Sequence, residues 1–175
     1  MAGKRNSKQR LNDTLAFIVK LMHENNVCNW FVAYGTLLGI VRENSCIDGD
    51  DDIDIVIHRE QYEKVKQIML DNNFELEYGY GICDNTNILK TKDREDYCTI
   101  DFYMAELDNV GNFNDTWENV IWSECYEHGN LVEYSWGDHT LYLPFNYEIK
   151  LVGRYGEKWR IPQNNKGPQH KKKIL

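Results

Sequence analysis

Four carboxylates stand within five residues in the acidic run 50–54, Asp-Asp-Asp-Ile-Asp, and an apolar segment follows it directly. Successive side chains of a β-strand point to opposite faces, so Asp52 and Asp54 would share one face and the isoleucines the other. Carboxylates this close repel one another, and a divalent cation removes that penalty. Oxygen-only ligands suit Mg²⁺ or Mn²⁺. The acidic run therefore predicts a magnesium or manganese site at the start of a strand.

The same run has two plainer interpretations. Most runs of charge are solvated turns, but this one leads directly into an apolar strand, which favours a site. A calcium loop of the EF-hand type that starts at Asp48 would need glycine where Ile53 stands and glutamate where Arg59 stands. The calcium loop is therefore excluded, and the solvated acidic turn stays as the alternative.

A further carboxylate, Asp101, stands between two apolar residues in the segment 98–105, which is typical of a strand. Alternation points its side chain away from those apolar neighbours. If this strand lies beside the one that carries Asp52 and Asp54, Asp101 becomes the third carboxylate of the set that two-metal phosphoryl-transfer sites need. The sequence leaves that arrangement open.

A Gly-Thr pair, Gly35 and Thr36, follows a predicted strand over 27–34 and opens a predicted short helix over 37–41. The amide groups at a helix start and a small hydroxyl can hold a phosphate. The pair alone is a weak signal. The order of strand, Gly-Thr, short helix and acidic strand strengthens it, and it predicts a phosphate-binding turn close to the acidic run.

Apolar periodicity predicts the elements that would position these residues. Spacing at Leu11, Leu15 and Ile18 indicates a helix with one buried stripe. The other expected elements are strands over 53–57, 74–80, 88–92 and 98–105, helices over 60–72 and 146–154, a loop over 109–114, and short strands within 117–143, including 140–143. This order predicts an α+β or α/β fold built around one small mixed sheet.

The length of 175 residues indicates one domain. We expect it over 11–162, between a basic, flexible N-terminus over 1–10 and a polar, basic tail over 163–175. A net charge of -8 makes nucleic acid an unfavourable main partner. No signal peptide or transmembrane segment is recognisable, which predicts a cytoplasmic protein. The five cysteines are odd in number and scattered, which favours reduced, mostly buried thiols.

The segment 34–42, Tyr-Gly-Thr-Leu-Leu-Gly-Ile-Val-Arg, together with the acidic run resembles the LicD family, which includes fukutin and the fukutin-related protein. It is similar to that family's Gly-Thr-Leu-Leu-Gly-x-x-Arg and Asp-Asp-Asp-x-Asp blocks, at similar spacing. A weaker similarity to the family's closing motif lies at 143–144 and 155–159. One departure is Asp-Gly at 48–49, where the family commonly has proline and a bulky aromatic residue, and this leaves the substrate open.

The resemblance implies a nucleotidyltransferase-like fold, a small mixed β-sheet flanked by helices. It also implies transfer of phosphocholine or a related phospho-alcohol, such as ribitol phosphate, from a CDP-linked donor to a sugar or glycan hydroxyl. The alternative is a nucleotidyltransferase that passes a nucleotidyl group to a small acceptor and releases pyrophosphate. A non-catalytic binding module is a third hypothesis, and the intact Gly-Thr and Asp-x-Asp elements argue against it.

The resemblance also implies roles for the carboxylates. Asp52 and Asp54 would hold Mg²⁺ (or Mn²⁺) against the donor's pyrophosphate. Asp101 would complete the site, either as a ligand or as the base for the acceptor hydroxyl. Asp50 and Asp51 would be outer ligands or would only fix the turn.

Three further residues would meet the nucleotide-linked donor. Gly35 and Thr36 would contact its phosphates. Arg42 would pair with a phosphate oxygen, or would be an ordinary surface arginine at a helix end. A chain of this length has little room for an acceptor-binding region, so we expect a partner subunit or a homo-oligomer to contribute to the cleft.

Overall fold

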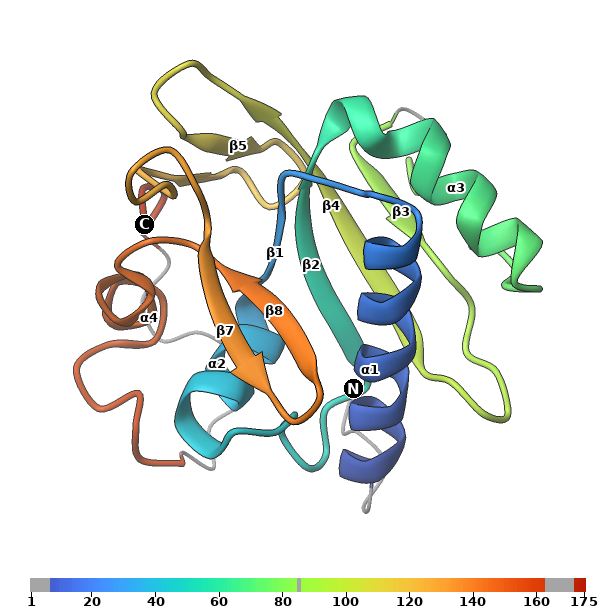
Figure 1. Cartoon of the computed structure of the whole chain (residues 1–175), viewed down its shortest axis with the longest axis horizontal. Helices are drawn as coiled ribbons and strands as arrows, with labels where there is room; N and C mark the ends of the chain where they lie inside the picture. Colours follow the sequence, from blue (N-terminus) through green and yellow to red (C-terminus); the bar gives the residue numbers. More distant parts are fainter. Residues whose placement is uncertain (1–6, 85, 163–171) are drawn as a thin grey trace.

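A six-stranded mixed sheet forms the centre of the computed structural model, which describes residues 7–84, 86–162 and 172–175 (Figure 1). The strand order is β1-β2-β4-β5-β6, and β3 also pairs with β4. The strands are β1 (Trp30–Val32), β2 (Asp52–His58), β3 (Ile88–Lys90), β4 (Thr99–Leu107), β5 (Phe113–Asp115) and β6 (Val120–Trp122). Strands β2 and β4 are parallel, and the other pairs are antiparallel.

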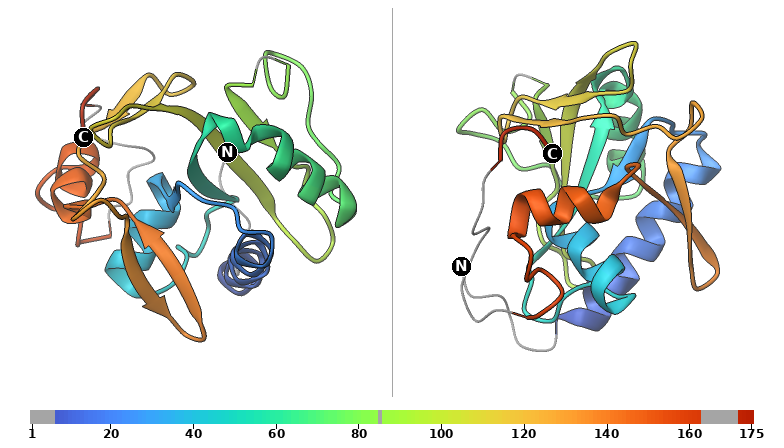
Figure 2. Two further views of the ribbon diagram at one scale, coloured as in Figure 1. Left: turned by 45° about the horizontal axis from the view of Figure 1, so that its top comes forward. Right: turned by 90° about the vertical axis from the view of Figure 1, so that its left-hand side faces the viewer.

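Helices α1 (Lys8–Glu24) and α3 (Tyr62–Asp71) lie side by side against one face of the sheet (Figures 1 and 2). A short 3-10 turn, η1 (Arg59–Gln61), leads from β2 into α3. Helix α2 (Tyr34–Glu43) follows β1, and the hairpin of β7 (Val132–Trp136) and β8 (His139–Leu143) precedes α4 (Tyr147–Tyr155). Within the described ranges, no helix combines the length and the apolar character that crossing a membrane requires.

The core explains why the sheet holds its shape. The predicted stripe of α1 is buried, with Leu15 and Ile18 fully inaccessible. The isoleucines of β2 and the apolar neighbours of Asp101 on β4 are buried as well. Burial of such side chains stabilises the fold by about 1.5–3 kcal/mol each. The predicted fold class, a small mixed sheet with helices around it, is confirmed.

Two predicted elements differ from the structure. Helix α1 begins at Lys8, so the last residues of the segment expected to be flexible, 1–10, are helical; residues 1–6 lie outside the described ranges. The strand expected over 74–80 is reduced to two isolated bridges, Leu76 with Thr91 and Gly79 with Ile82. Gly79 and Tyr80 have positive φ values of 104° and 54°, so the chain turns there instead of extending.

The remaining differences lie toward the C-terminus. The expected loop over 109–114 ends early, because β5 begins at Phe113. Of the basic tail expected over 163–175, the structure describes 172–175, and these residues lie along β6. The Ile121 amide donates to the Lys173 carbonyl at 2.7 Å, and the Leu175 amide donates to the Ile121 carbonyl at 2.8 Å. The end of the chain is therefore packed on the sheet.

Candidate active site

The parallel pairing of β2 with β4 places two aspartates side by side. Asp54 is the register partner of Asp101, so their side chains leave the same face of adjacent strands. Asp54 is 6% exposed and Asp101 is 5% exposed. Buried carboxylates are costly unless something compensates their charge. The neighbouring-strand arrangement that the sequence left open is thus present, and these two residues form the floor of the site.

The Gly-Thr pair belongs to the first turn of α2 and is tied to Asp54. The Gly35 amide donates to Asp54 Oδ2 at 3.0 Å, and the Asp54 amide donates to Thr36 Oγ1 at 2.9 Å. The Tyr103 hydroxyl donates to Asp54 Oδ1 at 3.1 Å. A negative group at a helix start is favourable because of the free amides there. The contacts hold the helix start against β2.

A side chain at position 35 would crowd two carboxylates of the site. A Cβ atom at this position would lie 2.7 Å from Asp50 Oδ2 and 3.3 Å from Asp54 Oδ2. The acidic run therefore approaches the backbone of the Gly-Thr turn directly. The predicted contact of Gly35 and Thr36 with donor phosphates stays a prediction.

Asp101 has one satisfied oxygen and one unsatisfied oxygen. Lys90 Nζ lies 2.9 Å from Asp101 Oδ2. Asp101 Oδ1 is buried and has no hydrogen-bond partner among the residues that the structure describes. Buried carboxylate oxygens normally find a partner, so an oxygen without one suggests a missing ligand. A divalent cation is the kind of ligand that fits it, because acidic side chains surround the position.

The acidic run supplies the closest carboxylate group. Within the part of the chain that the structure describes, Asp50, Asp51 and Asp52 bring oxygen atoms within 4.8 Å of one another. The predicted trio of Asp52, Asp54 and Asp101 does not form this tight group, although its members share one end of the β2–β4 pair. The acidic run 50–52 and the buried pair Asp54–Asp101 thus meet at one site. The assignment of metal ligands among these residues stays a prediction.

The pKa values follow from this crowding. Burial raises the pKa of Asp50 to about 6, and the charge of Asp52 adds to the effect. Burial, then the charges of Asp52 and Asp101, raises the pKa of Asp54 well above its ordinary value. Burial raises the pKa of Asp101 to about 7, although the Lys90 ammonium works in the opposite direction. Burial and the charge of Asp51 also raise the pKa of Asp52. The protein's own groups do not fully compensate the negative charge of these aspartates, and a site that binds a cation requires such uncompensated charge.

Arg42 lies in the last turn of α2 and pairs with its neighbour. Its Nε and Nη2 donate to Glu43 Oε1 at 2.9 and 2.6 Å. None of the aspartates at the site contacts it in the described hydrogen bonds. The structure thus places Arg42 in the helix-end arrangement, and a role with phosphate stays a prediction.

Behind the Gly-Thr turn lies a buried network that the sequence did not indicate. The Tyr34 hydroxyl donates to Asp115 Oδ2 at 2.5 Å. The Arg154 guanidinium stacks 4.6 Å over the Tyr34 ring and pairs with Glu118 at 3.2 Å. The next residue, Tyr155, is partly buried, and its pKa is raised by that burial and by the charge of Asp54. Tyr155 opens the motif at 155–159, so the motif's start reaches the site.

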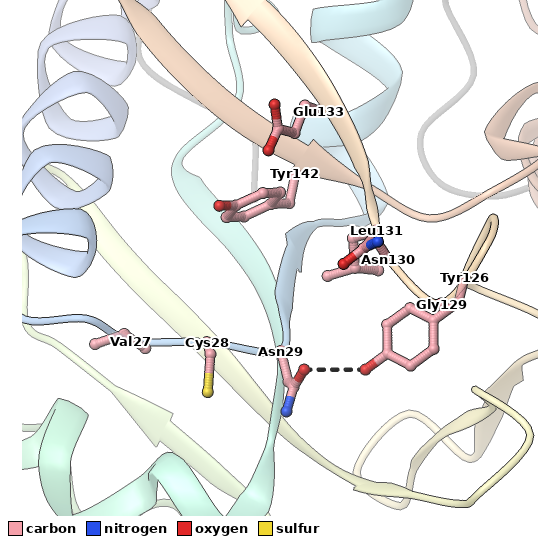
Figure 3. Close-up of a pocket in the computed structure, with 9 residues that line it drawn as sticks. All are labelled: Val27, Cys28, Asn29, Tyr126, Gly129, Asn130, Leu131, Glu133 and Tyr142. Atoms are coloured by element: carbon pink, nitrogen blue, oxygen red, sulfur yellow. Dashed lines mark hydrogen bonds between the residues drawn. The ribbon is translucent and has the colours of Figure 1, made fainter.

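A pocket of about 200 Å³ lies elsewhere (Figure 3). It is lined by Val27, Cys28, Asn29, Tyr126, Gly129, Asn130, Leu131, Glu133 and Tyr142. The Tyr126 hydroxyl donates to Asn29 Oδ1 at 3.0 Å. The Asn29 carbonyl accepts from the His58 amide, which marks the far end of β2 from the aspartates. His58 stands four positions after Asp54, which is roughly 13 Å along a strand. The pocket is distinct from the acidic site.

The fold and the acidic strands define a nucleotidyltransferase-like domain, and solved structures agree. The lincosamide antibiotic adenylyltransferase LnuA, with lincomycin bound, superposes with a TM-score of 0.58 at 17% identity, over 79% of this chain and 82% of LnuA. The solution structure of the antibiotic-resistance factor ANT(2'')-Ia gives a TM-score of 0.50 at 15% identity, and the match covers 75% of this chain and 63% of that protein's chain. These likenesses show the fold alone.

The chain belongs to the LicD/FKTN/FKRP family, because the family's nucleotidyltransferase-domain model matches residues 27–149. The expected family membership is therefore confirmed. The uncharacterized protein RP689 of Rickettsia prowazekii (strain Madrid E) is 38% identical over 142 residues, which is 78% of this chain and 46% of that protein. The chain thus spans about half the length of that relative.

Proposed function

We propose that this chain is a metal-dependent transferase that moves a phospho-alcohol group from a CDP-linked donor to a sugar or glycan hydroxyl. The group would be phosphocholine, ribitol phosphate or a similar one. The observation that carries the proposal is the buried pair Asp54–Asp101, which faces the Gly-Thr turn. One oxygen of the pair, Asp101 Oδ1, has no hydrogen-bond partner within the described ranges. Membership of the LicD/FKTN/FKRP family supports the reaction class.

The cation would be held by Asp52, Asp54 and Asp101, with Asp50 and Asp51 as outer ligands. Mg²⁺ or Mn²⁺ bound there would neutralise the charge that builds on the donor's pyrophosphate oxygens. The donor set consists of carboxylate oxygens, which is the chemistry these cations prefer. The unsatisfied oxygen of Asp101 and the raised pKa values of the cluster fit the same ion.

The chain's own residues divide the remaining work. The first turn of α2 offers amide groups to the donor phosphates, and Gly35 keeps that approach free of a side chain. Asp101 would either join the ligands or accept the proton of the attacking hydroxyl. The Tyr103 hydroxyl holds Asp54 by donating to its Oδ1, so the carboxylate keeps its orientation. Positioning of this kind accounts for most of the catalysis in phosphoryl transfer.

The test is a product assay. The purified protein is incubated with CDP-choline, CDP-ribitol or CTP, with methyl glycosides as acceptors, and with Mg²⁺ or EDTA. Release of CMP from a CDP-linked donor, with Mg²⁺ only, supports phospho-alcohol transfer. Pyrophosphate from CTP with nucleotidylated acceptor would support the alternative reaction. No turnover and no cytidine-nucleotide binding under any of these conditions would reject the proposal.

Metal should stabilise the fold by mass action. With Mg²⁺ or Mn²⁺ about tenfold above its dissociation constant, we expect the melting temperature to rise on the order of 5 °C over that in EDTA. Asp54→Asn should remove most of this shift, because it neutralises the buried centre of the cluster. Thermal scans of both proteins measure it. A wild-type melting temperature that is the same in metal and EDTA, with and without CDP, would contradict the site.

Two glycines of α2 should respond differently to alanine. In Gly39→Ala the new Cβ would lie 2.6 Å from the Ser45 carbonyl oxygen, a backbone atom, so the free energy of unfolding should fall by about 1–3 kcal/mol. In Gly35→Ala the nearest atom is the end of the Asp50 side chain, which can turn away. We therefore expect normal stability in Gly35→Ala but weaker metal-dependent CDP binding. Urea unfolding and calorimetry measure the two effects, and unchanged CDP affinity in Gly35→Ala would reject the phosphate-binding role.

A further inference from the structure

Lys90 is a cation at the edge of the acidic site that no sequence motif indicates. It is the last residue of β3 and the register partner of Asp101, so both side chains leave the same face of the sheet. Since Asp101 is also the partner of Asp54, the three residues form one row across β3, β4 and β2. Lys90 is thus the counter-ion of a carboxylate at the centre of the proposed metal site.

The ion pair is asymmetric. The Lys90 side chain is 23% exposed, whereas that of Asp101 is 7% exposed. Lys90 therefore reaches in from the solvent edge on a flexible stem, and Asp101 is fixed in the sheet. The ammonium satisfies only Oδ2, and no group in the described part of the chain hydrogen-bonds to Oδ1. Lys90 compensates the charge of Asp101 without using the carboxylate's full capacity.

Acidic side chains surround Lys90 and hold its ammonium near the site. Burial is the largest single effect on its pKa and lowers it, but the charge and hydrogen bond of Asp101 and the other acidic neighbours together outweigh burial, so the net shift is upward. Asp52 and Glu77 act on it in the same direction as Asp101. Lys90 in turn acts on the pKa of Asp52 and Asp101. Because several acidic groups surround the Lys90 ammonium, it can separate from Asp101 and still remain within the site.

We propose that Lys90 is an exchangeable counter-ion, which neutralises Asp101 when no metal is bound and turns to a phosphate oxygen of the donor when a divalent cation takes its place. The inference rests on the proposed function. A divalent cation and an ammonium compete for one carboxylate, and the ion with two charges wins where oxygen ligands converge. The displaced ammonium then meets the donor's phosphates, which lysine binds as a point charge. Asp101 thus has a cationic partner both before and after the donor binds.

This role predicts opposite changes in two affinities when Lys90 becomes methionine. Lys90→Met removes the competitor for Asp101, so Mn²⁺ should bind about tenfold more tightly. It also removes the phosphate contact, so CDP should bind about tenfold more weakly at saturating Mn²⁺. A lysine that only offsets a buried charge would leave CDP affinity unchanged or improve it. Calorimetry with Mn²⁺, and then with CDP at saturating Mn²⁺, measures both without any turnover.

Two variants serve as controls. Lys92 lies two residues further along and pairs with the exposed Glu75 at 3.0 Å, so Lys92→Met removes an equal charge from the same segment. It should change neither affinity. Lys90→Arg keeps the cation and should recover part of the CDP affinity. Unchanged CDP affinity in Lys90→Met, or an equal loss in Lys92→Met, would overturn the proposal.

The wild-type protein provides a measurement that does not depend on the folding of any variant. Acetylation of Lys90 by a succinimidyl ester, followed by mass spectrometry, should become faster with Mg²⁺ alone and slower with Mg²⁺ and CDP together. A rate that Mg²⁺ leaves unchanged would overturn the exchange, provided that Mg²⁺ binds. If the wild type binds neither Mn²⁺ nor CDP, the metal-dependent function itself fails, and the role of Lys90 fails with it.

Discussion

Replacing Asp101 by asparagine should lower the rate of group transfer by about a hundredfold or more, within the range measured for general bases. Asparagine has the same shape but neither binds a divalent cation strongly nor accepts a proton at neutral pH. The fold should survive, because the substitution removes a buried charge from a site that is 5% exposed. Lys90 would lose its anionic partner, but its side chain reaches solvent.

The same variant separates a catalytic site from a simple acidic turn. Asp50, Asp51 and Asp52 stay in place, so Asp101→Asn should keep part of the Mn²⁺ affinity. A turn that binds a cation by itself would lose neither metal nor activity. Single-turnover measurement of CMP release gives the rate, and Asp96→Asn is the control, since Asp96 is exposed and pairs with Arg94. An Asp101→Asn rate close to that of the wild type would show that Asp101 is neither ligand nor base.

Alternation along β2 was sufficient to predict which carboxylates share a face. Isoleucines at every second position are buried, and Asp52 and Asp54 alternate with them. Asp101 could be singled out because an acid between two apolar residues of a strand is unusual. The pairing of Asp54 with Asp101 could not be derived, because the register of two parallel strands depends on the connection through α3 and on packing far from either residue.

Lys90 and Tyr103 were missed as well, for different reasons. Each lies in a segment predicted as a strand, 88–92 and 98–105, and neither residue type is unusual there. Tyr103 stands two residues after Asp101, so alternation alone places it on the same face and could have indicated it. Lys90 faces the site only because β3 pairs with β4 in one antiparallel register. Without knowledge of that register, a lysine on an edge strand would be interpreted as a charge that prevents the edge from pairing with other chains.

The region after β4 carried the least information. Residues 117–143 show no clear periodicity, and Asp115 lies between the expected loop and that stretch. An aspartate among asparagine and threonine is typical of a solvated turn. In the structure Asp115 is fully buried, and it receives the Tyr34 hydroxyl from the start of α2. A contact between residues 81 positions apart leaves no local signal in a single sequence.

Asp115 accepts three hydrogen bonds, and this makes it a support of the active site. Besides the Tyr34 hydroxyl at 2.5 Å, it accepts from the Trp117 amide at 2.9 Å and the Glu118 amide at 3.1 Å. Tyr34 has a φ of 43°, in the left-handed region that a bulky side chain rarely adopts. Such a conformation persists only when its surroundings hold it, and Tyr34 directly precedes Gly35.

Asp115→Ala should therefore lower the free energy of unfolding by about 3 kcal/mol, because a buried hydroxyl and two amides lose their acceptor. The matched control is Asp108→Ala. Asp108 accepts from the Val110 and Asn112 amides at 3.0 and 2.9 Å, but it lies on the surface, where water can replace the lost acceptor, so we expect a much smaller loss. Urea unfolding measures both. Equal losses in the two variants would mean that Asp115 only closes a turn. A larger loss in Asp115→Ala, together with weaker CDP binding by the folded variant, would show that Asp115 holds Tyr34 in place. Tyr34 in turn holds the start of α2 against the aspartates.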